Sequence, residues 1–184
     1  MWERAEARRL LRGRASSMLA ASSEGVLSTG IELWRRLQEA GRAYGAGDKE
    51  AARASYLAVW EEARAAGDDY HACAAAHMLG VFEPTPAEEK LKWHRRALAC
   101  ADRAGSATGP AGPVASWRAS LYGNLGYASR LLGRLEDARR YYEEAWRHVG
   151  ALPQSAYGET VRADIERALG ELTGGSGSGS DTSE

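Results

Sequence analysis

The stretch GDKEAARASYLAVW, residues 47–60, is followed later in the chain by the similar stretch GRLEDARRYYEEAW, residues 133–146. In each stretch a glycine turn precedes apolar residues three and four positions apart, which is the period of an α-helix. The copies lie about two repeat lengths apart if one repeat has the roughly 34 to 47 residues of a helix-hairpin array. The sequence therefore predicts an internal repeat of helix hairpins. Six residues recur at identical spacing: Gly47, Glu50, Ala52, Arg53, Tyr56 and Trp60 match Gly133, Glu136, Ala138, Arg139, Tyr142 and Trp146.

A third, weaker copy is expected midway between these two stretches. Leu79 and Gly80 stand in its first helix, and Trp93, His94 and Ala97 stand in its second. One hairpin cannot bury its own apolar face, so about three stacked hairpins and a polar terminal helix are the smallest stable unit.

Glycine and proline residues divide the whole chain into segments of helical length. Residues 105–113 are rich in both and are predicted to form a loop. Helices are predicted over residues 31–45, 49–65, 70–82, 87–104, 114–132, 135–149 and 155–172.

The two ends of the chain are expected to differ from this helical part. A further helix over residues 1–19 is expected from Trp2, Leu10, Leu11, Met18 and Leu19, followed by a loop over residues 22–29. The Gly/Ser repeat near the C-terminus has no apolar surface to bury and predicts a flexible tail. The expected divisions are residues 1–29, a helical repeat domain over residues 30–172 and the tail over residues 173–184.

Composition favours the same fold class. Alanine dominates, Val and Ile are scarce, and the 184 residues include a single Phe. Because helix formers are abundant and strand formers are few, an all-α fold is predicted.

The repeated residues resemble the tetratricopeptide repeat family. The run Leu125-Gly126-Tyr127-Ala128, with the later turn glycine and small residues, is similar to that motif almost position by position. The run from Ala40 to Tyr44 is also similar, but its turn is one residue shorter. The middle unit departs further, because its turn carries two prolines and Lys90 stands where the family has a small alanine. The resemblance covers about residues 31–172 and implies a solenoid of about three hairpins with a C-terminal capping helix.

Charge and hydropathy exclude several classes of partner. The chain has 24 Lys+Arg and 25 Asp+Glu, for a formal net charge of -1, so it has no general basic field for nucleic acid. No apolar run approaches the ~20 residues of a membrane span, and residues 1–19 lack the apolar core of a secretory signal. We expect a cytoplasmic protein, and the excess of Arg over Lys indicates a bacterial source.

Signatures of catalysis are missing from the sequence. There is no phosphate-binding Gly-Lys-Ser/Thr loop, no Gly-x-Ser-x-Gly elbow and no His-Glu-x-x-His motif. The nearest approach to a metal site is Cys73 with His77 one helical turn later, with His71, His94 and Cys100 across the hairpin. Zinc is usually held by four ligands in tight pairs, so a packed cysteine and a half-solvated histidine are the preferred interpretation. No cofactor or metal is expected.

The resemblance places the functional surface on the first helices of the hairpins. In the family these helices line a concave groove that receives a peptide or a partner's helix, and some members place an asparagine at the position of Asn124 to contact a carboxylate. The pair of lysines that completes that clamp is missing here, although Arg42, Asn124 and Arg130 could hold an acidic group. The inward positions are Gln38, Arg42, His77, Met78, Val81, Asn124, Tyr127 and Arg130.

The sequence therefore favours a non-enzymatic scaffold that binds a protein or peptide partner in a concave groove. The alternative is a regulatory sensor whose groove takes a small ligand or signalling peptide, and a metal-binding or enzymatic helical protein is a third interpretation. The identity of the partner and the oligomeric state are left open.

Overall fold

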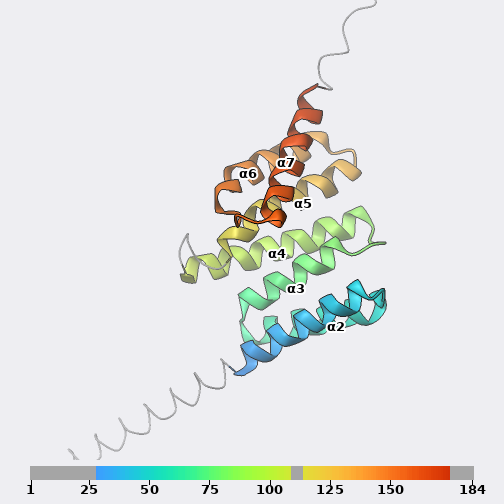
Figure 1. The fold of residues 1–184 in the computed structure, drawn as a ribbon, viewed down its shortest axis with the longest axis vertical. Coiled ribbons are helices and arrows are strands. Elements are labelled where there is room, and N and C mark those ends of the chain that lie inside the picture. The colour runs from blue at the N-terminus through green and yellow to red at the C-terminus, as the bar shows by residue number, and fades with distance from the viewer. Residues whose placement is uncertain (1–27, 109–113, 175–184) are drawn as a thin grey trace, which may run out of the picture.

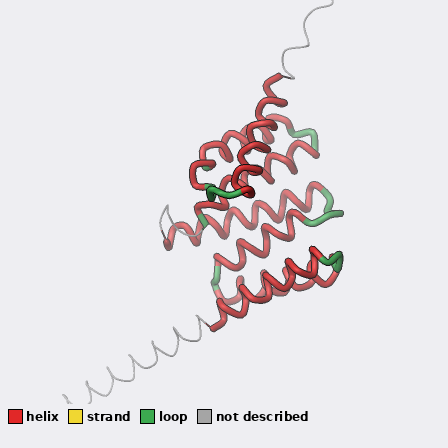
Figure 2. Tube along the Cα trace, viewed as in Figure 1, coloured by secondary structure: helices red, strands yellow, loops and turns green. Residues whose placement is uncertain are grey.

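The structure, a computed structural model, describes residues 28–108 and 114–174. Within these two ranges the chain consists of helices joined by short turns, and it contains no strand (Figure 2). The prediction of an all-α fold is confirmed.

The helices follow one another along the stack in chain order (Figure 1). A helix over residues 28–45, here the 28–45 helix, leads the described chain. The others are α2 (Lys49–Ala66), α3 (Asp69–Val81), α4 (Ala87–Thr108), the 3₁₀ turn η1 (Ala115–Trp117), α5 (Arg118–Leu131), α6 (Leu135–Arg147), the 3₁₀ turn η2 (Val149–Ala151) and α7 (Ala156–Gly174).

Most helix ends lie within two residues of the predicted positions. The main difference is at residues 105–108, which were predicted to be part of a loop and are helical. Residues 105–108 continue α4, and the Ser106 hydroxyl donates a hydrogen bond to the Asp102 carbonyl one turn earlier (2.8 Å). Residues 28 and 29, expected in a loop, and residues 173 and 174, expected in the tail, are helical as well. The predicted helix over residues 1–19 and the tail from residue 175 lie outside the described residues.

The turns between hairpin helices follow from local chemistry. Gly47, Gly67 and Gly133 have φ values of 92°, 71° and 69°, in the left-handed region that glycine enters without a steric penalty. Asp48 and Asp68 accept hydrogen bonds from the backbone amides three residues later, which caps α2 and α3.

The same close contact recurs inside each hairpin. A glycine of the first helix faces a Tyr or His side chain of the second helix. A Cβ added at Gly80 or Gly126 would come within 3 Å of ring atoms, and one added at Gly41 would lie 3.3 Å from the Tyr56 hydroxyl oxygen. The pairs are Gly41 with Tyr56, Gly80 with His94, and Gly126 with Tyr142. The middle pair lies where the weaker third copy was expected.

Lys90 gives the middle hairpin a contact that the other two lack. Its side chain is 5% exposed, and its Nζ donates hydrogen bonds to the Phe82 carbonyl (2.8 Å) and to the Glu83 carboxylate (2.7 Å). The long side chain thus reaches the C-terminal end of α3, whereas its counterparts Ala52 and Ala138 simply allow close packing.

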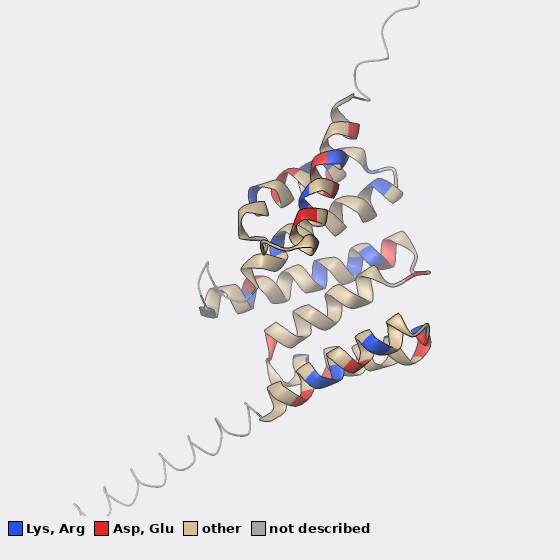
Figure 3. Cartoon of the chain, viewed as in Figure 1, with Lys and Arg blue, Asp and Glu red and all other residues tan. Residues whose placement is uncertain are grey.

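Helix α3 is the central buried helix of this arrangement. It packs against both α2 and α4. Asp69 is its one charged residue, so the helix is almost entirely tan in Figure 3.

Within the described residues, no helix combines the length and the apolar character that a membrane crossing requires.

Candidate functional site

Two cavities lie on the face formed by the 28–45 helix, α3, α5 and α7. The first, here the aromatic cavity, has a volume of about 360 Å³. Its walls come from six elements, and four of its residues carry aromatic rings other than histidine. The lining residues are Trp34, Leu37, Gln38, Tyr56, Ala74, His77, Met78, Trp117, Ser120 and Tyr157.

Packing between hairpins holds the rings of this cavity in place. The Tyr70 ring lies 6.3 Å from the Trp34 ring and stacks on the Trp117 ring at 4.9 Å between centroids. Tyr70 therefore links the two tryptophans, which belong to the first and third hairpins. Trp34 and Tyr157 remain 42% and 51% exposed, so much of each ring faces solvent at the cavity mouth.

His77 is the one titratable imidazole that lines the aromatic cavity. Burial lowers the pKa of His77 to about 4, so the ring is neutral at neutral pH. Its Nδ1 is buried and has no hydrogen-bond partner among the described residues. No Lys, Arg, Asp or Glu of the described residues lines the cavity, which makes it an uncharged, aromatic surface.

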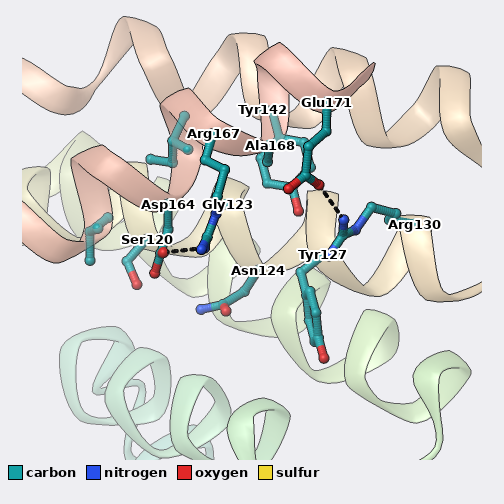
Figure 4. Close-up of a pocket in the computed structure, with 12 residues that line it drawn as sticks. Ser120, Gly123, Asn124, Tyr127, Arg130, Tyr142, Asp164, Arg167, Ala168 and Glu171 are labelled. Carbon is teal, nitrogen blue, oxygen red and sulfur yellow. Dashed lines mark hydrogen bonds and ion pairs between the residues drawn. The ribbon is translucent and has the colours of Figure 1, made fainter. Parts of the chain in front are cut away.

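The second cavity, here the polar cavity, lies between α5 and α7 and has a volume of about 420 Å³. Figure 4 shows two ion pairs on its wall: Arg130 with Glu171 (2.7 Å) and Arg167 with Asp164. Each guanidinium therefore has a carboxylate partner, and the formal charges on the wall balance. The lining residues are Ser120, Gly123, Asn124, Tyr127, Arg130, Tyr142, Val161, Asp164, Ile165, Arg167, Ala168 and Glu171.

Ser120 lines both cavities, which are therefore neighbours. Its small side chain is 8% exposed. We refer to the two neighbouring cavities together as the groove. The groove has an apolar, aromatic part and a polar part.

Six of the eight predicted site residues line the groove. Gln38, His77 and Met78 lie in the aromatic cavity, and Asn124, Tyr127 and Arg130 lie in the polar cavity.

Arg42 and Val81 line neither cavity. The Arg42 side chain is 68% exposed, and its nearest charged partner is Glu39 at 4.0 Å. Arg42, Asn124 and Arg130 are consequently not gathered around one point, and Arg130 already holds the carboxylate of Glu171. The geometry supplies no shared carboxylate site for the three residues.

Sequence reasoning missed the aromatic rings that shape the groove. Trp34 and Tyr157 lie in the predicted helices over residues 31–45 and 155–172, but neither was among the predicted groove positions. Trp117 precedes α5 in a 3₁₀ turn. Trp34 could have been found from its position one helical turn before the predicted inward residue Gln38. No local motif links Tyr157 to the cavity residues of α3, which lie far earlier in the chain.

The two repeat-equivalent tryptophans differ in their surroundings. Trp60 packs edge-on against Trp93, with 5.2 Å between ring centroids, and Arg96 lies over both rings. Trp146 is 42% exposed. Trp60 therefore serves packing between hairpins, whereas Trp146 has no later second helix to pack against among the described residues.

The residues considered for a metal site are dispersed. His71 pairs with Asp68 (Nδ1 to Oδ2, 2.6 Å), and the rings of His77 and His94 lie 5.7 Å apart. Burial raises the pKa of the Cys73 thiol to about 12, which disfavours the thiolate that a metal needs. Across residues 28–108 and 114–174, no group of three or more His, Cys, Asp or Glu side chains could hold a metal ion.

Comparison with protein-family models finds no match to this chain, and comparison with curated proteins finds no significant match.

Proposed function

We propose that this protein is a tetratricopeptide-like helical repeat scaffold, without enzymatic activity, that binds a protein or peptide segment in the groove. In three successive hairpins a glycine of the first helix lies against a Tyr or His side chain of the second helix, and this recurrence supports the repeat architecture. The proposed solenoid comprises these three hairpins and α7 as the capping helix.

The observation that carries the binding function is that two cavities neighbour each other and share the lining residue Ser120. An extended segment needs a surface longer than one small-molecule site, and the groove runs across three hairpins and α7. Concave surfaces with a large apolar part and a few polar groups are the common sites of ligand binding.

A sensor that takes a small ligand is the second candidate. Each cavity alone, at about 360 and about 420 Å³, falls in the size range of small-molecule sites, which is about 300 to 1,000 Å³. In that case one cavity would fill without the other, and the ligand would alter the packing between α5 and α7.

The two candidates predict different binding partners for the purified full chain. Selection from a random peptide display library is expected to yield binders whose affinity falls in the variant Tyr127→Ala. The matched control is Trp146→Ala on α6, which removes an aromatic residue that is 42% exposed, as against 40% for Tyr127, and lines neither cavity. Absence of peptide binders, together with a small molecule released from the denatured protein and detected by mass spectrometry, would favour the sensor.

We further propose a cytoplasmic location. Both cysteines of the chain, Cys73 and Cys100, are free and buried, which accords with a reducing compartment. Localisation of the tagged full chain in the source cell tests this.

A further inference from the structure

A further cavity, here the alanine cavity, lies between the 28–45 helix and α2 and has a volume of about 400 Å³. It shares no lining residue with the groove. Two of its lining residues are charged, and both already have partners: Arg36 pairs with Glu62, and Glu39 pairs with Arg35. The rest of its wall consists of small side chains, those of Ala40, Ala43, Ala54, Ser55 and Ala58.

Three positions on this wall have counterparts in the other two hairpins. The counterparts follow from aligning the hairpins on the glycine contact that each of them contains. In the order of first, middle and third hairpin, the matching sets are Ala40, Leu79 and Leu125; Ala43, Phe82 and Ala128; and Ser55, Trp93 and Tyr141.

In the middle hairpin, the preceding helix α2 covers two of these positions. The Trp60 ring of α2 packs edge-on against the Trp93 ring, with 5.2 Å between centroids. The Tyr56 ring of α2 packs edge-on against the Phe82 ring at 5.8 Å. The second helix of the first hairpin therefore lies against both helices of the next hairpin.

In the third hairpin, the preceding helix α4 covers the same positions. Its Leu91 and Leu98 pack in one apolar cluster with Leu125, Ala128 and Tyr141. The 28–45 helix and α2 form one end of the described stack (Figure 1), and no described helix precedes them. At this end the corresponding space is open, and it is the alanine cavity.

The chain itself contains a segment that fits this space. Residues 1–19, with their predicted helix, precede the 28–45 helix as α2 precedes α3 and as α4 precedes α5. Leu11 and Met18 stand seven residues apart, like the two leucines of α4, and this spacing places them on one helix face.

The segment is also long enough to reach the cavity. A helix over residues 1–19 would be about 28 Å long, and the 28–45 helix is about 27 Å long. Residues 20–27 can span up to about 26 Å when extended, so the segment can fold back alongside the 28–45 helix.

We propose that residues 1–19 form a helix that packs into the alanine cavity and caps this end of the stack, with Leu11 and Met18 against its small side chains. Attachment to the 28–45 helix favours this segment over a second copy of the chain, because a tethered segment is present at an effective concentration of about millimolar. Since the cavity shares no lining residue with the groove, the cap stands or fails separately from the proposed peptide binding.

Hydrogen–deuterium exchange of the full chain, measured by mass spectrometry, tests the cap. Amides of residues 1–19 are expected to exchange at least about tenfold more slowly than those of a free peptide of the same sequence. Ala58→Glu should remove this protection, since it places a charge in the space that the helix fills. Ala65→Glu is the control, because Ala65 is an exposed alanine of α2 that does not line the cavity. Exchange at the rate of the free peptide, or equal effects of the two variants, would overturn the proposal.

A matched pair of variants in the segment gives the reciprocal test. Leu11→Asp is expected to lower the melting temperature of the full chain by at least about 2–4 °C, because the apolar contact with the cavity is lost. Ser16→Asp adds the same charge on the opposite face of the predicted helix and should leave the melting temperature unchanged. Equal melting temperatures of the two variants would contradict the cap.

A cross-link distinguishes the segment of the same chain from that of a second copy. The double variant Leu11→Cys, Ser55→Cys is treated with a short bismaleimide under native conditions, and the parent protein, whose Cys73 and Cys100 are buried, gives the background. A cross-linked monomer is expected, whereas Leu11→Cys with Ser106→Cys, an exposed position on α4 outside the cavity, should give none. A cross-linked dimer would assign the cavity to a second copy, and either that result or the absence of any cross-link would overturn the proposal.

Discussion

Gly126 of α5 lies directly against the ring of Tyr142 of α6, so that a Cβ atom at Gly126 would stand 2.9 Å from three ring atoms. Real Cβ atoms essentially never approach another heavy atom so closely. Tyr142 is 5% exposed and cannot swing into solvent without opening the hairpin. The position therefore accepts only glycine, because the Tyr142 ring occupies the space that a larger side chain would need.

Gly126→Leu is expected to lower the free energy of unfolding by at least about 2 kcal/mol, because the branched side chain must displace Tyr142 or separate the helices. Urea denaturation followed by circular dichroism measures the change. Gly170→Leu on α7 is the control, since a Cβ there meets nothing within 4 Å. That variant should be neutral or slightly stabilising, and an equal loss in both variants would contradict the assigned register.

The hairpins were predictable because their signals are local. Glycines at positive φ, aspartate caps and apolar residues at helical spacing lie next to the elements that they specify. Continuation of α4 through Thr108 was not predictable, because Gly105 and Ser106 disfavour a helix by propensity alone. In the structure Gly105 lies beside Arg118 and Val114, and the Ser106 hydroxyl donates a hydrogen bond to the Asp102 carbonyl one turn earlier.

Lys90→Ala is expected to destabilise the protein by about 2–3 kcal/mol, because it leaves the Phe82 carbonyl without its donor and removes buried packing. The measurement is again the urea unfolding curve. Lys92→Ala, two residues later and exposed, is the control and should lie within about 0.5 kcal/mol of the parent protein. Indistinguishable curves for the two variants would mean that the buried lysine contributes nothing.

Stability is expected to fall as the pH is lowered from 7 to 5. Burial lowers the pKa of His77 to about 4, and burial together with the nearby His77 and Lys90 lowers the pKa of His94 to about 3. Since both pKa values lie below the unfolded value of about 6.5, the unfolded chain binds more protons in this interval. The loss is about 1.4 kcal/mol per pH unit for each histidine below pH 6.5, and it ends near the folded pKa values.

Unfolding free energies at pH 7, 6 and 5 measure this dependence. Carboxyl groups titrate mainly below this interval, so the histidines dominate it. His77→Phe should reduce the pH dependence by about half. A free energy of unfolding that stays constant between pH 7 and 5 would show that both rings take up protons in the folded state without cost.

The groove was only partly predictable, for a geometric reason. Helix periodicity identifies which residues share a face, and the family resemblance named Met78 and Asn124 as inward positions; both line the cavities. Periodicity does not say where along a helix a cavity ends, and Arg42 and Val81 lie beyond that end. It also cannot reveal that α7 crosses the polar end, which is why the pairing of Arg130 with Glu171 was unforeseen.

The ion pair of Arg130 with Glu171 leads to a prediction for the binding of an acidic peptide to the groove. Arg130→Glu places a carboxylate beside Glu171 and changes the wall of the polar cavity from balanced to net negative. Affinity for a groove-binding peptide with an acidic residue should fall by about 2 kcal/mol, since the peptide carboxylate would face two negative charges where the parent protein has a balanced ion pair. Stability should change by no more than about 1 kcal/mol, because the Arg130 and Glu171 side chains are 41% and 50% exposed.

Two further charge reversals serve as controls, measured by calorimetric titration of the same peptide. Arg42→Glu alters net charge equally but lies outside both cavities, so affinity should be unchanged. Arg140→Glu does the same on α6, where Arg140 is 74% exposed and paired with Asp137. If Arg42→Glu weakens binding as much as Arg130→Glu, the peptide extends beyond the two cavities along the 28–45 helix. If Arg140→Glu alone weakens it, the binding surface lies on the second helices, and the groove residues named above are not its determinants.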